Sequence, residues 1–355
     1  MAPDQKLDQE KVEAFLERFI GDLGAAAHAA TVTVGERLGL YRALAAGGPQ
    51  TTEELAARTD CEPRLVEEWI NAQVASDYCV HDAATDRYWL TPEQAFCLAD
   101  DTSPAYVAPH MRIATSIHKD EERLRGAFTG DNTLGWHEHH GDLFEAMALS
   151  SQVDYLPLVP EWVPALDGVE AKLRSRARVA DIGCGYGAPL ILLAGAYPNS
   201  VFAGFDYHSA SIDAARKAAA EAGVSDRATF EVATGSDFPG EGYDLICTFD
   251  AIHDMGNPVE VARHIRQSLA PDGTWAIVEL NAGDTVEDNR TPFGRLLYSA
   301  SLFICVPNAL SQGAKRPLGA AAGEARLRAV ATEAGFTRFR RVAESPYNLV
   351  LEARP

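Results

Sequence analysis

The sequence has few cysteines, few cationic residues and no long apolar run. Its six cysteines stand apart at positions 61, 79, 97, 184, 247 and 305, and none form a CxxC pair. This usage is typical of a reducing compartment and argues against a disulfide framework or a zinc site. No segment reaches about 18 uninterrupted apolar residues, and MAPDQKLDQE at 1–10 lacks a signal-peptide pattern. We therefore expect a cytoplasmic protein with no membrane span.

The shortage of positive charge limits the partners. Lysine and arginine total 31 against 51 acidic residues, which gives a net charge of −20. Self-repulsion of this size opposes binding to nucleic acid or to an anionic membrane. Hydrophobic residues make up 46% of the 355 residues, enough for a large core. At ~150 residues per domain the length predicts about two domains.

Three regions differ in pattern, with expected boundaries at 1–100, 101–174 and 175–355. In the first, residues 25–48 read as a helix ended by two glycines, and helices at 51–59 and 63–76 follow. Two short strands around a polar turn then complete a helical winged-helix domain. The second region, rich in aromatic residues and histidines, is expected to be a helical linker that packs between the domains.

The third region alternates strands and helices, which predicts a parallel, doubly wound α/β sheet. The expected strands are 178–182, 201–206, 228–233, 244–249, 274–280, 336–343 and 347–353. The expected helices are 188–196, 209–222, 257–270 and 324–334. Only the short AESP link joins the last two strands, so that pair can form an antiparallel hairpin but not a crossover.

A glycine loop follows the first of these strands, in the stretch RVADIGCGYGAPL. Gly183, Gly185 and Gly187 let the backbone approach a ligand, and the next helix points its amide groups at negative charge. Asp206, about 20 residues further on, can bind both ribose hydroxyls of a nucleotide. The loop also satisfies the dinucleotide fingerprint, so this pattern alone does not separate the two kinds of cofactor. Asp181, just before the loop, suits a cationic amino group better than a pyrophosphate, which favours S-adenosylmethionine.

The D-x-G-x-G-x-G loop and the succession of strands resemble the class I S-adenosylmethionine-dependent methyltransferases over about 178–353. The resemblance implies a Rossmann-like, seven-stranded sheet with an antiparallel last strand. It implies that Asp181 holds the methionine amino group and that Asp206, beside Tyr207, holds the ribose. For the adenine, the residues after the third strand are implied, here Asp237 and Phe238.

The segment CTFDAIHDMGNP closes the fourth strand, where ligands of parallel sheets bind. Phe249, Asp250 and His253 should therefore face the cofactor cleft. A histidine can take a proton from a hydroxyl as that hydroxyl attacks a methyl carbon. Asp254 could orient the histidine or cap the next helix. Glu279 ends the fifth strand close to the same edge.

This pairing resembles the small-molecule O-methyltransferases that carry an N-terminal winged-helix dimerisation domain. His253, Asp254 and Glu279 match that family's base, its acidic neighbour and its supporting glutamate, while Met255 stands where a tryptophan is common. The resemblance implies a small-molecule acceptor, S-adenosyl-L-methionine as cofactor with S-adenosyl-L-homocysteine as product, and a homodimer. The alternative is that His253 only shapes the pocket.

Two further segments invite a functional interpretation. The HEHH cluster contains His137, His139 and His140, and spacing would let the first and third share a helical face. A metal site, a polar pocket rim and a solvated loop are the alternatives, of which we favour the solvated loop and expect no metal. The long connection 281–323 carries Tyr298, Ser301 and Cys305 on an apolar face. It is interpreted as a substrate lid, with simple interface packing as the alternative.

Rival functions remain open at this point. A winged-helix transcription regulator with a nucleotide-sensing domain would need a basic footprint, yet residues 51–92 contain three arginines against nine acids. An NAD-linked dehydrogenase would need a separate substrate domain. Methyl transfer to nitrogen, sulfur or carbon stays as an alternative to oxygen.

Overall fold

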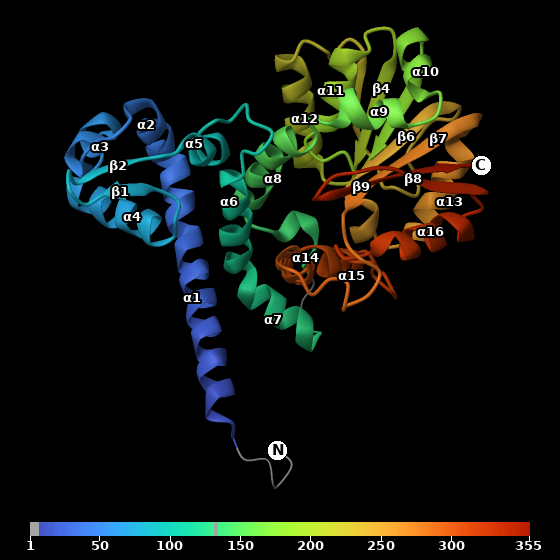
Figure 1. Cartoon of the computed structure of the whole chain (residues 1–355). Helices are drawn as coiled ribbons and strands as arrows, with labels where there is room; N and C mark the ends of the chain where they lie inside the picture. Colours follow the sequence, from blue (N-terminus) through green and yellow to red (C-terminus); the bar gives the residue numbers. More distant parts are fainter. Residues whose placement is uncertain (1–6, 131–133) are drawn as a thin grey trace. The chain divides into compact units, whose positions relative to one another are not determined.

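The computed structural model describes residues 7–130 and 134–355. The chain divides into two compact units, Met1–Ser116 and Ile117–Pro355, both drawn in Figure 1. Positions 1–6 of the polar N-terminal stretch lie outside the described residues, as do positions 131–133.

The first unit is a winged-helix domain with a long N-terminal helix. Thr51 caps the helix after the turn and exchanges hydrogen bonds with Glu54 in a capping box, and Pro63 opens the helix after that. The expected two-stranded wing is confirmed. The elements are α1 (Gln9–Leu38), α2 (Leu40–Gly47), α3 (Thr52–Thr59), α4 (Pro63–Ala75), β1 (Val80–Asp82), β2 (Arg87–Trp89) and α5 (Pro92–Leu98).

The single helix expected over 25–48 is wrong. Gly39 adopts a left-handed conformation with φ of 72°, and its N–H bonds the carbonyls of Gly35 and Glu36. This is a helix-ending glycine motif, so α1 stops at Leu38 and α2 starts at Leu40. The apolar periodicity continues across Gly39, so the sequence pattern gives no sign that the helix ends there.

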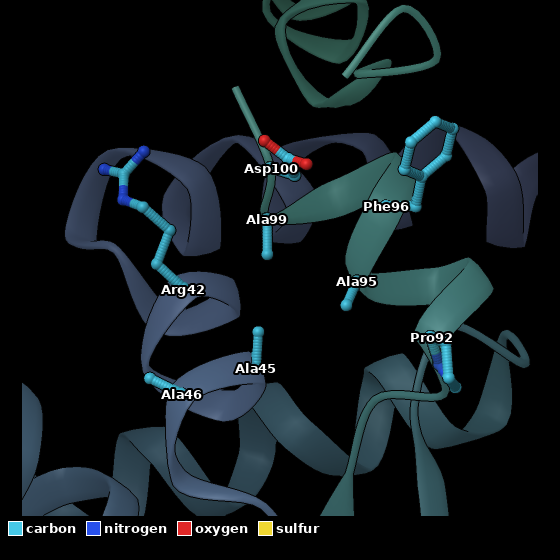
Figure 2. A pocket seen from close by; sticks show the side chains of 8 residues that line it. All are labelled: Arg42, Ala45, Ala46, Pro92, Ala95, Phe96, Ala99 and Asp100. Carbon is cyan, nitrogen blue, oxygen red and sulfur yellow. The ribbon is translucent and has the colours of Figure 1, made fainter. Parts of the chain in front are cut away.

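A shallow apolar groove of about 510 Å³ lies in this unit, between α2 and α5 (Figure 2). Four alanines form much of its wall, with Arg42 and Asp100 as its charged members. Every lining residue belongs to the first unit, whereas the motifs that carry chemistry belong to the second. The groove is therefore not the site to which those motifs point.

The second unit is built on a seven-stranded sheet with the order β5-β4-β3-β6-β7-β9-β8. Five strands run parallel, and β9 pairs antiparallel with both β7 and β8. The expected seven-stranded sheet with its final hairpin is confirmed. The strands are β3 (Arg178–Ile182), β4 (Val201–Asp206), β5 (Ala228–Val232), β6 (Tyr243–Phe249), β7 (Leu269–Leu280), β8 (Arg338–Glu344) and β9 (Asn348–Arg354).

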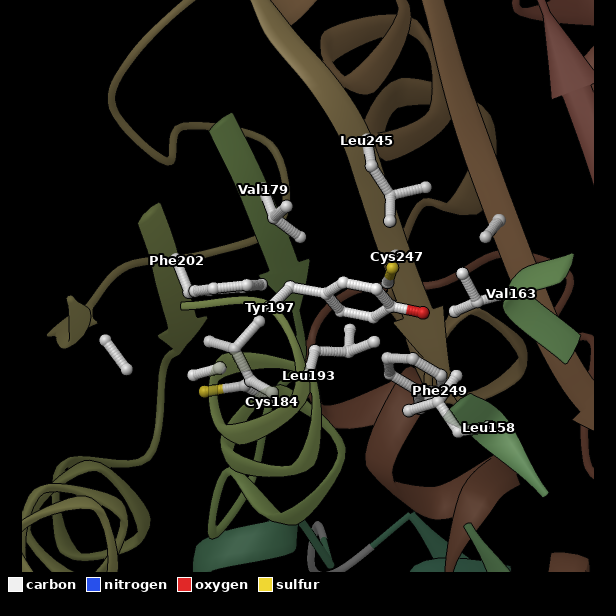
Figure 3. Packing of buried hydrophobic residues seen from close by; sticks show 14 of the residues in the cluster. Leu158, Val163, Val179, Cys184, Leu193, Tyr197, Phe202, Leu245, Cys247 and Phe249 are labelled. Atoms are coloured by element: carbon white, nitrogen blue, oxygen red, sulfur yellow. The ribbon is translucent and has the colours of Figure 1, made fainter. Parts of the chain in front are cut away.

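Helices cover both faces of this sheet, so its core has two layers. Figure 3 shows one layer, in which Val179, Phe202 and Leu245 of the strands pack against Leu193 and Tyr197. The other layer lies under the remaining helices. The flanking helices are α9 (Val163–Ala165), α10 (Val169–Ser175), α11 (Ala188–Ala196) and α12 (Ser209–Glu221) on the first face, and α13 (Pro258–Ser268) and α16 (Gly323–Glu333) on the second.

Two further groups of helices lie outside the sheet and its flanking layers, and the first of them begins with α6 at the end of the first unit. The segment before the sheet contains α6 (Ala108–Ile117), η1 (His118–Asp120), α7 (Glu121–Thr129), η2 (Trp136–Glu138), α8 (Gly141–Asp154) and the π-helical turn η3 (Leu158–Trp162). The long connection from β7 to β8 contains α14 (Pro292–Phe303) and α15 (Cys305–Ser311).

The α14–α15 pair is the one part of the described chain with the length and hydropathy of a membrane span. The stretch Pro292–Ser311 has 20 residues, and 44% of it is buried inside the structure. Ile304 separates its two helices. Partly buried core helices have the same composition, and the contacts of α15 described below are those of a helix that packs on the domain.

Candidate functional site

The glycine loop lies at the point where the order of successive strands in the sheet reverses. Chain order runs outward from β3 through β4 to β5 and then crosses to β6 on the other side of β3. This switch point opens a crevice at the carboxyl ends of the strands. Gly183, Gly185 and Gly187 all have positive φ, at 76°, 51° and 79°. A side chain added at Gly185 would meet no atom within 4 Å, so this glycine borders open space.

Asp181 is the least satisfied polar group at this edge. The residue is fully buried, and neither carboxylate oxygen has a hydrogen-bond partner within the described part of the chain. Burial, with a smaller contribution from the charge of Asp206, raises the pKa of Asp181 well above its usual value. A buried carboxyl without partners is costly. Asp181 is therefore suited to a cationic ligand group that the protein itself does not supply.

Asp206 binds the backbone of the loop from the end of β4. Its two oxygens accept hydrogen bonds from the N–H groups of Gly185 at 2.9 Å and His208 at 2.8 Å. Burial raises the pKa of Asp206, while these two bonds act in the opposite direction. Each carboxylate oxygen can accept a second hydrogen bond, so the ribose role remains available to it.

The residues proposed for adenine are placed differently from each other. Asp237 is exposed and accepts two hydrogen bonds from Thr234, through its backbone N–H and its hydroxyl. Phe238 is 1% exposed, stacks on Phe205 and meets the edge of His264. The Phe238 ring is thus part of the core under the loop, and the contact of Phe238 with adenine that the sequence suggests stays a prediction.

His253 and Glu279 form a buried pair at the ends of β6 and β7. His253 Nδ1 lies 2.5 Å from Glu279 Oε2, and the His253 backbone N–H donates to Glu279 Oε1 at 3.2 Å. Burial alone would lower the pKa of His253. The charge of Glu279 and the interactions with Glu279 and Cys305 raise this pKa by more than burial lowers it, so it lies well above the usual value. Glu279 thus fixes the imidazole by one ring nitrogen and leaves Nε2 for other contacts.

Asp254 plays neither of the two roles that the sequence suggested for it. Glu279 rather than Asp254 orients His253, and Asn257 rather than Asp254 caps α13 through its side chain. Burial raises the pKa of Asp254 to about 6, against the opposing effects of His253 and a hydrogen bond with Asn308. Asp254 is an acidic neighbour of the pair, placed in the short helix η4 (Ile252–Asp254).

Asp250 occupies a strained position one residue after β6. Its φ is 46°, unusual for a residue with a side chain, and its backbone N–H bonds Val278 at 2.9 Å. The Tyr155 hydroxyl donates to Asp250 Oδ2 at 2.6 Å. Burial, and then the charge of Glu279, raises the pKa of Asp250 to about 7. Phe249 packs edge-on against Tyr155 and is 6% exposed.

The sequence interpretation missed Asn308, which joins its own helix α15 to three other parts of the site. Its Oδ1 accepts hydrogen bonds from the Tyr207 hydroxyl at 2.9 Å and from the Trp136 backbone N–H at 3.1 Å. Its Nδ2 donates to the Asp254 carbonyl at 3.3 Å. Asn308 belongs to α15, so this helix is held against the edge of the sheet. The only available signal was its place in the long connection after β7.

Cys305 also lies near the site from α15, because its side chain is close enough to His253 to raise the pKa of that histidine. Ser301 is buried in α14, where its hydroxyl accepts a bond from the Ala320 N–H, and Tyr298 contacts Asn289. The expected apolar lid face therefore splits, with Cys305 at the histidine and the other two residues in local contacts.

The three histidines of the HEHH cluster do not act together. The turn η2 ends at Glu138 and the backbone becomes extended, so His137 and His140 do not share the helical face that their spacing suggested. His140 caps α8 by accepting the Asp142 N–H at 3.2 Å. His139 alone is buried, and its partner is Asp120. Among the described residues, no group of three metal-binding side chains gathers here or elsewhere.

Comparison with protein families assigns both units. Residues 173–314 match the model described as a methyltransferase domain, and residues 26–100 match an Rv2258c-like winged helix-turn-helix domain. The first match contains the glycine loop, the His253–Glu279 pair and Asn308. Both domain types expected from the sequence are confirmed.

Individual relatives agree with this assignment. The chain is 32% identical over 108 residues to the 27-O-demethylrifamycin SV methyltransferase of Amycolatopsis mediterranei, a match over 30% of this chain and 39% of that protein. An O-methyltransferase family structure from Burkholderia thailandensis has a TM-score of 0.69 at 20% identity, with 99% of each chain covered. Human N-acetylserotonin methyltransferase, solved with S-adenosylmethionine, has a TM-score of 0.66 at 16% identity, covering 100% and 99%. These solved structures share the fold over the whole chain.

Proposed function

We propose that this chain, which belongs to the class I S-adenosylmethionine-dependent methyltransferases, methylates a hydroxyl group of a small aromatic molecule with His253 as the general base. The observation that carries the proposal is the buried His253–Glu279 pair at the carboxyl edge of the sheet. The pair is beside a glycine loop with the features of a cofactor site, so base and loop share one crevice.

The residues at the crevice fit S-adenosylmethionine. Asp181 offers two buried oxygens without partners to the amino group, and Gly185 borders open space where the ligand backbone would pass. Asp206 is placed for the ribose at the end of β4. When bound, the cofactor would supply an electrophilic methyl group on a sulfonium. The relative solved with this cofactor has the same fold, which supports the assignment.

The protein's own part in the reaction is alignment and proton transfer. Glu279 holds His253 Nδ1, which leaves Nε2 to take the hydroxyl proton as the oxygen attacks. The imidazolium that results is stabilised by the carboxylate of Glu279 next to it. The hydrogen bonds of Asn308 hold α15 against the same edge of the sheet, so this helix is in position to exclude water.

The acceptor is proposed from the relatives and from the site together. The relatives named above carry the names of small-molecule acceptors, demethylrifamycin SV and N-acetylserotonin. Aromatic side chains near the crevice include Trp136, Phe144 and Tyr207. A flat aromatic compound can pack against these aromatic side chains, and the hydroxyl of a phenol loses its proton readily to a histidine.

We also propose a homodimer formed through α1. The N-terminal half of this helix exposes Phe15, Leu16, Phe19, Ile20 and Leu23, a contiguous apolar face on one side. Light scattering should give twice the 38.3 kDa of one chain. Phe15→Glu with Phe19→Glu should give monomers, while Glu17→Gln on the same helix should not.

As part of the same proposal the protein works in the cytoplasm, where its six free thiols stay reduced.

A labelled-methyl assay tests the proposed reaction. The purified chain is incubated with S-adenosylmethionine that carries a labelled methyl group and with matched panels of phenols, amines and thiols. We expect labelled ethers from phenols and S-adenosylhomocysteine as co-product. Calorimetry should give micromolar affinity for the cofactor, about −8 kcal/mol, which Asp206→Ala greatly weakens. Labelling of amines or thiols alone, or binding of NADH in place of the methionine cofactor, would refute the proposal.

A further inference from the structure

A second buried histidine–acid pair lies outside the mechanism described so far. His139 Nδ1 is 2.7 Å from Asp120 Oδ2, and the His139 side chain is completely buried. Its other ring nitrogen, Nε2, is also buried and has no hydrogen-bond partner within residues 7–130 and 134–355. The two residues come from separate turns, η1 and the link between η2 and α8, so folding brings them together.

This pair is connected to the methyl-transfer site through Asn308. The ring of Trp136 meets the ring of His139 edge-on at 6.2 Å, and the Trp136 backbone N–H donates to Asn308 Oδ1. The same asparagine donates to the carbonyl of Asp254, the residue after His253. One side chain thus bonds both turns, the one that carries His139 and the one that carries His253.

The chemistry of His139 Nε2 restricts which ligand groups could form a hydrogen bond with it. When Nδ1–H donates to Asp120, Nε2 of the neutral ring is an acceptor, and Nε2 of the cationic ring is a donor. A hydroxyl group can pair with either form, because it both donates and accepts. A buried nitrogen without any partner is costly, so a ligand hydroxyl that reaches it should bind more tightly, by about tenfold.

We propose that His139 Nε2 binds a second hydroxyl group of the acceptor, and that Asp120 positions the ring for this contact. The inference rests on the proposed function and narrows its substrate class. The acceptor would be a small aromatic molecule with at least two hydroxyl groups, one presented to His253 for methylation and the other held by His139. Orientation by two separate contacts would select which hydroxyl is methylated.

Equilibrium binding tests this inference without any need for turnover. Calorimetry on protein saturated with S-adenosylhomocysteine compares 1-naphthol with the isomeric dihydroxynaphthalenes. At least one isomer should bind about tenfold or more tightly than 1-naphthol. His139→Leu should abolish that preference. His139→Gln, whose amide can place a donor and an acceptor near the position of Nε2, should keep part of it. Asp120→Asn, which still accepts the Nδ1–H, should weaken it less than His139→Leu.

Two controls separate binding of the acceptor from support of the fold. The affinity for S-adenosylhomocysteine should be nearly the same in wild type and all three variants. His139→Leu should lower the melting temperature, because it leaves the buried Asp120 without its partner, but every variant should still be folded at the temperature of the titration. If His139→Leu lowers cofactor affinity as much as it lowers naphthalenediol affinity, the pair is structural and the inference is overturned. It is also overturned if no isomer outbinds 1-naphthol, or if the preference survives in His139→Leu. A preference that depends on His139 without methylation of any phenol would overturn the proposed reaction and leave this site standing.

Discussion

His253 and Glu279 are joined twice, by a 2.5 Å contact from Nδ1 to Oε2 and by the His253 N–H donated to Oε1 at 3.2 Å. The two residues stand at the ends of neighbouring parallel strands, β6 and β7, and are nearly inaccessible to water. The carboxylate therefore fixes both the backbone turn and the ring of the histidine. Geometry of this kind lets one nitrogen exchange a proton while the other stays anchored.

Removal of the imidazole is the first prediction. His253→Ala should lower kcat for a phenolic acceptor by roughly 10²–10⁴-fold, because proton removal from the attacking oxygen is lost. Phenols ionise partly in water, so the lower part of that range is expected. Affinity for S-adenosylhomocysteine should change little, since the loop residues proposed to bind it are untouched. Asn257→Ala, at the cap of α13, serves as the control outside the site. An unchanged kcat would leave His253 as a residue that only shapes the pocket.

Glu279→Gln should move the pH dependence of kcat to lower pH. The Glu279 charge helps to hold the pKa of His253 above the usual ~6.5, against the opposing effect of burial. A base must be unprotonated, so wild-type activity should rise with pH through that elevated pKa. Without the charge, the imidazolium is less stable and the rise should begin at lower pH, with a smaller maximal kcat. The control Glu260→Gln, on the exposed side of α13, should leave the curve where it is. A shift toward higher pH would contradict the assigned pairing.

The strands, the glycine loop and the His253–Glu279 pair could be predicted from the sequence because their signals are local. Apolar runs separated by helical periods give the strands in their order along the chain, and Asp181 and Asp206 stand at fixed spacings from the glycines. His253 and Glu279 could be paired in advance because adjacent parallel strands end at the same edge.

The rest of the site depends on contacts that no local pattern encodes. Asn308 reaches Tyr207 across 101 residues and Trp136 across 172, and Tyr155 reaches Asp250 across 95. Their partners are set by how the helical segments pack on the sheet. Phe238 lies in the core among its neighbours, which its place after β5 did not indicate, and its contact with the cofactor stays a prediction.

Asp250→Asn should stabilise the cofactor-free protein at neutral pH. Burial and the charge of Glu279 raise the pKa of Asp250 from 3.8 to about 7 in the folded chain. Between these two pKa values the folded state keeps a proton that the unfolded state releases. The contribution of Asp250 to the free energy of unfolding is therefore fully present below pH ~4 and is lost as the pH rises to 7. The melting temperature of Asp250→Asn relative to wild type should climb between pH 5 and pH 7.5. Asp237→Asn, an exposed position, should show no such climb. A difference that is constant with pH would show that Asp250 titrates normally.

Asn308 and Tyr207 should be energetically coupled, and the coupling should control α15. Asn308→Ala leaves the Tyr207 hydroxyl and the Trp136 N–H without their acceptor, at a cost of about 1–3 kcal/mol if both stay buried. Tyr207→Phe removes one of these donors, so the double variant should lose less stability than the two single losses added together. Denaturant unfolding of the four proteins gives the coupling energy, and amide exchange within Cys305–Ser311 should speed up in Asn308→Ala. Asn308→Asp keeps an acceptor at Oδ1 but loses the donor to the Asp254 carbonyl, so it should preserve the bond to Tyr207 and slow exchange only in part. Additive losses with unchanged exchange would mean that α15 is held by its apolar contacts and that Asn308 does not secure it.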